Sequence, residues 1–185
     1  MLTPPGLVDL VQFLDRLAAL PRTGWALRGV TDVESIAEHS LGVAFVASLL
    51  VDDLRARGVA VDGERVLRMA LLHDAAEAFT GDIPMPAKTP TLKAALARAE
   101  DELLAGVLTP DQLALWREAE AGDTIEARVI KAADKLQMAI KALTYAQQGR
   151  GRLDEFFAGA STRPADLELA REVFAEIERR RPGRS

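Results

Sequence analysis

The two histidines of this 185-residue chain are its first candidates for chemistry, because it contains no others. Each stands beside a carboxylate: Glu38 precedes His39, and Asp74 follows His73. Both histidines fall on helix faces that are otherwise apolar, so one interpretation is a pair of core histidines with satisfied hydrogen bonds. A buried carboxylate without a partner, however, costs several kcal/mol, and Asp74 would be such a group. Imidazoles and acids placed together therefore favour a bound cation.

A third segment supplies another carboxylate. Asp134 falls on or next to the apolar stripe of its helix, where it could also pair with Lys131 or Lys135 at the edge of the stripe. Mixed nitrogen and oxygen donors suit one divalent transition ion (Mn, Fe, Co, Ni, Cu or Zn) better than Ca. Four protein ligands leave positions open for water and substrate, as a catalytic metal requires. The candidate ligands come from three helices: His39, His73, Asp74 and Asp134.

Composition limits the class of protein that holds these residues. The chain is 49% hydrophobic and 28% charged, with a net charge of −5 and no cysteine, which excludes thiolate zinc sites, iron–sulfur clusters and cysteine nucleophiles. The acidic balance argues against a nucleic-acid partner. Charges interrupt every apolar run before the ~20 residues of a membrane span, and the first residues lack a signal peptide. We therefore expect a soluble, cytoplasmic protein with one domain over residues 1–185.

Helical periodicity dominates the sequence. Apolar residues recur at spacings of three and four, and no sustained alternation bounded by hairpin turns indicates a sheet. Clusters of breakers predict loops over residues 22–25 and 80–86. The expected fold is all-α, with helices over residues 6–20, 31–57, 62–78, 124–148 and 164–181 and two more that begin near residues 90 and 110.

Capping motifs mark the expected helix starts. Thr31 with Glu34, and Asp123 with Glu126, have the spacing of a capping box. Asp62 can cap the helix that follows it. Three threonines stand just before a proline at or near the first helical position, where its missing N–H group costs nothing: Thr89, Thr109 and Thr162.

The ordered set of ligands resembles the H…HD…D signature of the HD-domain metal-dependent phosphohydrolases. The surrounding strings are more specific: GW at 24–25, ESIAEHS at 34–40, LHDAAE at 72–77, TGDIP at 80–84 and AADKL at 132–136. Within the superfamily they are similar to the 5′-deoxynucleotidase branch, whose members remove phosphate from deoxyribonucleoside 5′-monophosphates. The similarity extends from about residue 10 to 156. It implies a single-domain helical bundle of the HD type.

The resemblance assigns roles residue by residue. His39, His73, Asp74 and Asp134 become the metal ligands, and Glu77, one helical turn from His73, becomes the acid or base of catalysis. The alternative for Glu77 is an exposed glutamate near a helix end.

A sugar-binding loop is also implied, formed by Asp82, Ile83, Pro84 and Met85. In it Asp82 would accept a hydrogen bond from the 3′-hydroxyl, although a turn aspartate bonded to its own backbone fits equally. Trp25 would pack beside the sugar and exclude a 2′-hydroxyl, or it could be a lid over the first helix pair.

Gly24 departs from the pattern of the family. Some members carry arginine immediately before the tryptophan, where it orients the phosphate, whereas Gly24 offers only its backbone N–H group. If the phosphate needs a side-chain cation, Arg22, Arg28 or Lys88 must supply it. The sequence does not choose among the three.

The implied activity is hydrolysis of nucleoside 5′-monophosphates, with 2′-deoxy substrates preferred. One alternative is an HD enzyme that cleaves a phosphodiester or a signalling nucleotide with the same ligands. Another is a non-enzymatic helical dimer whose metal only holds the fold, a role that gives the free carboxylate of Glu77 no purpose. Apolar positions left over on many helices predict a homodimer.

Overall fold

The computed structural model describes residues 3–157 and 167–183 of the chain. All regular structure in these two ranges is helical, apart from one isolated bridge between Pro21 and Ser35. The expected all-α class is therefore confirmed. The helices in chain order are α1 (Pro4–Asp15), the 3₁₀-helix η1 (Arg16–Ala18), α2 (Thr23–Ala26), α3 (Ile36–Ala56), α4 (Gly63–Leu72), α5 (Glu77–Thr80), η2 (Met85–Ala87), α6 (Pro90–Ala105), α7 (Pro110–Ala121), α8 (Ile125–Gln147), α9 (Asp154–Phe157) and α10 (Glu168–Arg180).

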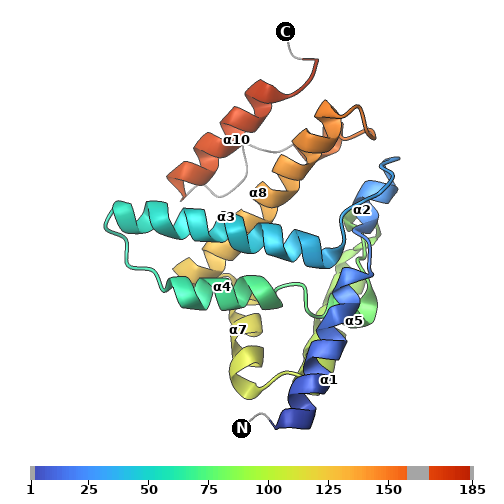
Figure 1. Ribbon diagram of the computed structural model, residues 1–185, viewed down its shortest axis with the longest axis vertical. Coiled ribbons are helices and arrows are strands. Elements are labelled where there is room, and N and C mark those ends of the chain that lie inside the picture. The colour runs from blue at the N-terminus through green and yellow to red at the C-terminus, as the bar shows by residue number, and fades with distance from the viewer. Residues whose placement is uncertain (1–2, 158–166, 184–185) are drawn as a thin grey trace.

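Helix α8 forms the centre of the bundle. Helices α3, α4, α7 and α10 all pack on it, and α3 crosses in front of it in Figure 1. Small side chains allow this close approach, because α8 buries a series of alanines: Ala127, Ala132, Ala133, Ala139 and Ala142. The crossing brings the first turns of α3 beside the middle of α8.

Several predicted caps are confirmed. Thr89 and Thr109 accept hydrogen bonds from the third residue after them and are followed by proline at the first helical position. Asp62 caps α4 through the N–H group of Arg65. The predicted cap at Thr162 lies outside the described residues.

Two predicted capping boxes are wrong. The cap of helix α3 is Ser35, four residues after the expected cap Thr31, and Glu38 completes the box. Glu34 cannot serve there because its carboxylate is buried and bound by other side chains. Helix α8 is capped by Thr124 rather than Asp123, while a carboxylate oxygen of Glu126 accepts the N–H group of Asp62.

Two boundaries around the predicted loops are also wrong. The segment 22–25 is not wholly a loop, since Thr23–Ala26 forms the single turn α2. The expected helix over 62–78 ends at Leu72, and residues 73–76 form a tightened turn before α5. Bonds of the i to i−3 type replace helical ones there, from Ala75 to Leu72 and from Glu77 to Asp74.

No helix of the described ranges offers a stretch long and apolar enough to cross a lipid bilayer.

Candidate active site

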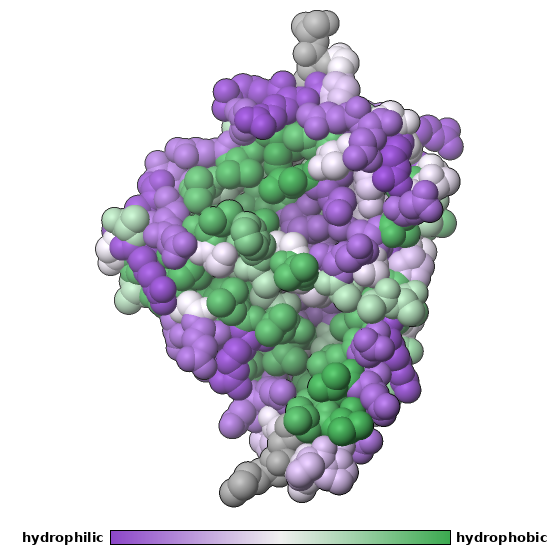
Figure 2. Space-filling model, in the orientation of Figure 1, coloured by the Kyte–Doolittle hydropathy of each residue, from purple (hydrophilic) through white to green (hydrophobic). Residues whose placement is uncertain are grey.

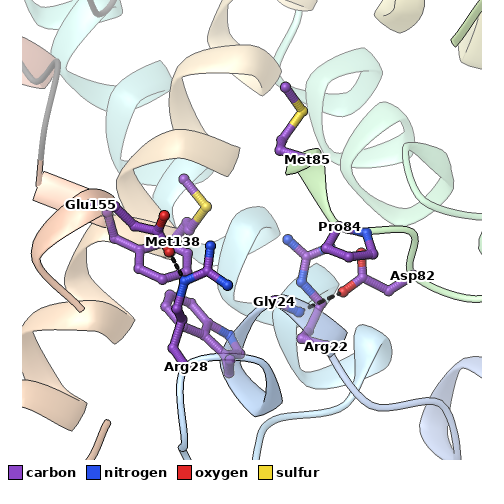
Figure 3. Close-up of a pocket in the computed structure, with 10 residues that line it drawn as sticks. Arg22, Gly24, Arg28, Asp82, Pro84, Met85, Met138 and Glu155 are labelled. Carbon is purple, nitrogen blue, oxygen red and sulfur yellow. Dashed lines mark hydrogen bonds and ion pairs between the residues drawn. The ribbon is translucent and has the colours of Figure 1, made fainter. Parts of the chain in front are cut away.

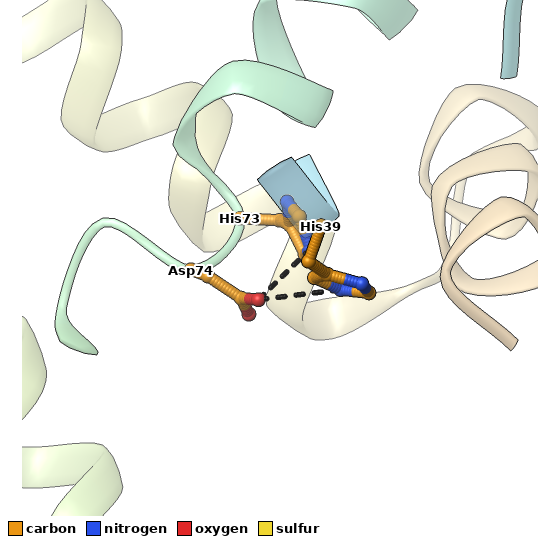
Figure 4. Close-up of side chains that lie close together, drawn as sticks. All are labelled: His39, His73 and Asp74. Atoms are coloured by element: carbon orange, nitrogen blue, oxygen red, sulfur yellow. Dashed lines mark ion pairs between the residues drawn. The ribbon is translucent and has the colours of Figure 1, made fainter. Parts of the chain in front are cut away.

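His39, His73 and Asp74 form a compact group of potential metal ligands. His39 lies at the end of the first turn of α3, and the other two lie where α4 gives way to the tightened turn (Figure 4). One carboxylate oxygen of Asp74, Oδ2, is 3.2 Å from His73 Nε2 and 3.5 Å from His39 Nε2. One donor atom from each of the three residues lies within 4.8 Å of the other two. The structure thus joins residues that are 34 positions apart in the sequence.

Asp134 reaches the same place from α8 but stands slightly apart. Its Oδ1 is 3.2 Å from His39 Nε2, and its side chain is 40% exposed. The compact group of three does not include it. The proposed pairing with Lys131 is not formed, because the Lys131 ammonium donates to the backbone carbonyl of Glu120.

The hydrogen bonds of the two imidazoles leave both Nε2 atoms facing the site. His39 Nδ1 is 2.6 Å from the amide oxygen of Gln137, and His73 Nδ1 is 2.8 Å from the carbonyl oxygen of Ala70. Carbonyl oxygens only accept, so each Nδ1 carries the proton. Both Nε2 atoms are buried without a hydrogen-bond partner in the described structure, and both face the Asp74 carboxylate. Such an arrangement of lone pairs and negative charge fits a cation.

The charges of the site shift its pKa values strongly. Burial lowers the pKa of the His73 imidazole, but Asp74 outweighs it and raises that pKa to about 9. Burial raises the pKa of the Asp74 carboxyl, but His73 and Arg22 bring it well below its usual range. In the absence of a metal, a proton on His73 therefore supplies the positive charge that Asp74 requires.

Glu77 and Arg22 border the group of ligands. Arg22 Nη1 is 3.4 Å from Asp74 Oδ2 and 3.8 Å from Glu77 Oε2, and both carboxylate side chains are less than a fifth exposed. Burial, with the Asp74 charge second, raises the pKa of Glu77 to about 8. A carboxyl group with such a pKa exchanges protons near neutrality, as a catalytic acid or base must.

A cavity of about 470 Å³ opens beside Arg22 (Figure 3). This volume lies in the range of small-molecule sites, ~300–1,000 Å³. One part of its lining is apolar: Trp25, Pro84, Met85, Met138 and Phe156. The rest is Gly24 and four charged side chains: Arg22, Arg28, Asp82 and Glu155. Of the predicted sugar loop, Asp82, Pro84 and Met85 line the cavity, and Ile83 is not among its lining residues.

Trp25 is both a lining residue of the cavity and a buried packing residue. It lines the cavity, yet it is only 2% exposed and packs against Phe156 and Tyr145, with ring centroids 4.3 and 5.5 Å away. Its indole N–H group donates to Glu34 at 3.0 Å. The ring is therefore a fixed wall.

Asp82 holds two segments of the wall together. Its Oδ2 accepts the backbone N–H groups of Thr23, at 2.5 Å, and Gly24, at 3.4 Å. It thereby caps α2 from a loop almost 60 residues away in the sequence, rather than bonding to its own backbone. No described residue donates to its Oδ1, so the contact with a sugar hydroxyl stays a prediction.

The three candidate phosphate cations differ in their surroundings. Arg22 faces the candidate ligand Asp74 and the carboxylate of Glu77, whereas Arg28 forms an ion pair with Glu155. The charge of Lys88 slightly lowers the pKa of Glu77. A side chain at position 24 would meet no atom within 4 Å of its Cβ.

Several residues of the site are missed by sequence reasoning. Gln137 and Glu34 are buried polar side chains behind His39, and Met138, Glu155 and Phe156 line the cavity. Gln137 follows Asp134 by three positions and so shares its face of α8, which is the one signal that could have identified it. Glu155 and Phe156 fall in the last segment of the family resemblance, but nothing local indicates a pocket.

Comparisons with known proteins agree with this site. A family model described as HD domain matches residues 14–172. The chain is 33% identical to the human protein 5′-deoxynucleotidase HDDC2 over 92% of its own length and 87% of the relative. It is 36% identical to 5′-deoxynucleotidase PM0747 from Pasteurella multocida over 70% of each protein.

Solved structures share the same architecture. A conserved hypothetical protein from Pyrococcus furiosus superposes with a TM-score of 0.82 at 36% identity, over 93% of this chain and 99% of the other. A protein from Magnetospirillum magnetotacticum described as a predicted metal-dependent phosphohydrolase gives a TM-score of 0.66 at 30% identity, over 97% of each chain. The chain therefore belongs to the HD-domain family. Within it, the chain groups with the proteins named 5′-deoxynucleotidase.

Proposed function

We propose that the protein is a metal-dependent phosphomonoesterase that hydrolyses nucleoside 5′-monophosphates to nucleoside and phosphate and prefers 2′-deoxyribonucleotides. The observation that carries the proposal is the convergence of two unpartnered imidazole Nε2 atoms on the Asp74 carboxylate, beside a cavity that Arg22 shares. The relatives named 5′-deoxynucleotidase support the choice of substrate.

His39, His73, Asp74 and Asp134 would hold one divalent transition ion. The ion would supply an activated water and polarise the phosphoryl group. Asp134 lies near enough to His39 to join the ligands by a small movement of its half-exposed side chain. The ligand types do not separate Mn, Fe, Co, Ni, Cu and Zn.

Arg22 is the phosphate contact that we favour. Its guanidinium pairs with Asp74 beside the candidate ligands, where the phosphoryl group must lie, whereas Arg28 pairs with Glu155 in the cavity wall. A planar guanidinium binds two phosphate oxygens at once, which would compensate for the glycine at position 24.

Glu77 would move the proton, as the acid that protonates the leaving 5′-oxygen or as the base for the attacking water. Its Oε2 is buried without a hydrogen-bond partner in the described structure and faces Arg22 Nη1 at 3.8 Å. Trp25 would close the sugar end against a 2′-hydroxyl, and Asp82 Oδ1 would accept the 3′-hydroxyl.

We further propose a cytoplasmic homodimer. Helix α3 exposes three large apolar side chains one turn apart, Leu41, Phe45 and Leu49, which are 52–69% exposed. Hydrophobic residues gather on this face over α3, α4 and α1 (Figure 2). A second copy of the chain would cover them. Light scattering should give twice the chain mass, and Phe45→Glu should reduce it to the monomer.

Phosphate release tests the activity. Purified protein, stripped with a chelator and reloaded with each divalent ion, should release phosphate from deoxyribonucleoside 5′-monophosphates faster than from ribonucleotides. Cyclic nucleotides and other phosphodiesters should be poor substrates. Preferred cleavage of a diester would replace this proposal with the phosphodiesterase alternative, and metal binding without any hydrolysis would indicate a structural ion.

A further inference from the structure

Glu34 is a buried carboxylate that no proposed catalytic step uses. It precedes the cap of α3 and is only 4% exposed. Its Oε1 accepts the indole N–H group of Trp25 at 3.0 Å. Its Oε2 accepts the amide N–H group of Gln137 at 3.0 Å, and the Lys141 ammonium lies 3.1 Å from the same oxygen. Such complete pairing of a buried acid by three donors indicates a defined structural task.

The backbone of Glu34 is anchored as well. Its N–H group donates to the hydroxyl of Tyr145, and its carbonyl oxygen accepts the N–H group of Arg22, both at 3.0 Å. Glu34 therefore touches the cavity wall, the segment of the proposed phosphate contact and, through Gln137, the metal ligand His39. The backbone of Glu34 is thus held in place independently of the bonds that its carboxylate makes.

The hydrogen bonds from Glu34 through Gln137 to His39 fix which atom donates and which accepts at each step. A carboxylate only accepts, so Gln137 must turn its NH₂ group toward Glu34. Its amide oxygen then faces His39 Nδ1, at 2.6 Å, and an amide oxygen also only accepts. The proton of His39 is consequently held on Nδ1, and the lone pair of Nε2 faces Asp74 and Asp134.

We propose that Glu34 is a positioning residue, which fixes the metal-binding tautomer of His39 through Gln137 while its other oxygen holds the Trp25 wall. The inference rests on the metal site of the proposed function. It makes one buried carboxylate a common support for the metal and the substrate cavity. Outer partners of this kind tune ligand orientation and affinity in metal sites.

The space that Gly42 leaves for the Gln137 side chain supports this role of Glu34. A Cβ at Gly42, one turn after His39 on α3, would lie 2.8 Å from Gln137 Cγ and 3.1 Å from its Nε2. Glycine inside a helix costs ~0.5–1 kcal/mol relative to alanine. At position 42 it leaves the space in which Gln137 crosses α3 and reaches both Glu34 and His39.

The test compares zinc affinity, by competition with a chromophoric chelator, in wild type, Glu34→Gln, Gln137→Met and the double variant. A glutamine at position 34 can donate, so the Gln137 amide can turn round and present its NH₂ group to His39 Nδ1. The proton then moves to Nε2, where the metal must bind. We expect each single variant to bind zinc roughly 10–100-fold more weakly.

The double variant should bind zinc no more weakly than Gln137→Met alone, because that variant already lacks the hydrogen bonds that link Glu34 to His39. Glu38→Gln is the matched control, since it makes the same change on the residue next to His39 but on an exposed side chain, and zinc affinity should be unchanged. If Glu34→Gln does not fold, Gln137→Met carries the test alone.

Two outcomes would overturn the inference: zinc affinity unchanged in the single variants, or losses that simply add in the double variant. Failure of the proposed function is distinguishable. If zinc binding depends on Glu34 and Gln137 as expected but the wild-type protein releases no phosphate, only the activity is refuted. A wild-type protein that binds no divalent ion would refute both.

Discussion

Gly42 offers the sharpest test of the packing behind the site. It lies in the interior of α3, where alanine is favoured over glycine by about 1 kcal/mol. The obstacle to alanine is the side chain of Gln137, whose Cγ, Nε2 and Cδ would lie 2.8, 3.1 and 3.3 Å from the new Cβ. Gln137 cannot move aside freely, because its amide group binds Glu34 and His39. The substitution should therefore change the stability differently in the wild type and in a variant that lacks the Gln137 side chain.

In the wild type, Gly42→Ala gains about 1 kcal/mol of helix propensity and loses about 1–3 kcal/mol to overpacking. The free energy of unfolding should thus stay level or fall by up to about 2 kcal/mol. In a Gln137→Ala background the obstacle is gone, and Gly42→Ala should raise the free energy of unfolding by about 1 kcal/mol. The coupling between the two positions is then about 1–3 kcal/mol.

Urea unfolding of the metal-free protein, followed by circular dichroism, measures these differences. They are comparable if the dependence of the free energy of unfolding on urea concentration is the same in every variant. Gln147→Ala provides the control background, because Gln147 is an exposed glutamine on the same helix. It should leave the effect of Gly42→Ala as in the wild type. Equal stabilisation by Gly42→Ala in all three backgrounds would refute the argument that Gln137 requires the glycine.

Three further predictions concern individual side chains. Glu77→Gln should retain its metal by elemental analysis yet lose roughly 10²–10⁴-fold in turnover, and loss of the metal would instead make Glu77 a ligand. Trp25→Phe should narrow the preference for deoxyribonucleotides, which a fixed wall sets at about 1–3 kcal/mol, whereas an unchanged ratio of turnover numbers would assign the ring to packing alone. Glu118→Gln should destabilise the fold at neutral pH only, because hydrogen bonding to Arg65 lowers the pKa of the Glu118 carboxyl. The stability that this carboxylate contributes is present above its pKa in the unfolded chain and is lost as the pH falls through its pKa in the folded protein. A difference in urea midpoint that does not depend on pH would contradict this.

The helices follow from the sequence where local chemistry decides the structure. A threonine that caps and a proline that follows it need nothing from the rest of the fold, so the starts of α6 and α7 could be predicted. The end of α4 could not. The apolar pattern continues through residues 73–76, and only the local bonding that tightens this turn separates α4 from α5.

The candidate metal ligands stand out in the sequence because they violate the apolar pattern of their helices. His39, His73 and Asp74 are polar groups at positions that the pattern buries, and such violations require a chemical reason. The cavity wall could not be predicted in the same way. Phe156 and Met138 are ordinary apolar residues locally, and they become a wall only when α9 and α8 meet beside α2.

Glu34 shows why the support of a site is harder to predict than the site itself. Both Glu34 and Glu38 have a candidate cap three residues before them, Thr31 and Ser35, so local rules allow either glutamate to complete a capping box. The choice depends on which carboxylate the interior can satisfy. Trp25, Gln137 and Lys141 provide donors only at position 34, from segments up to 107 positions away in the sequence. Ser35 therefore caps helix α3, which leaves Glu38 in solvent and places His39 beside the other candidate ligands.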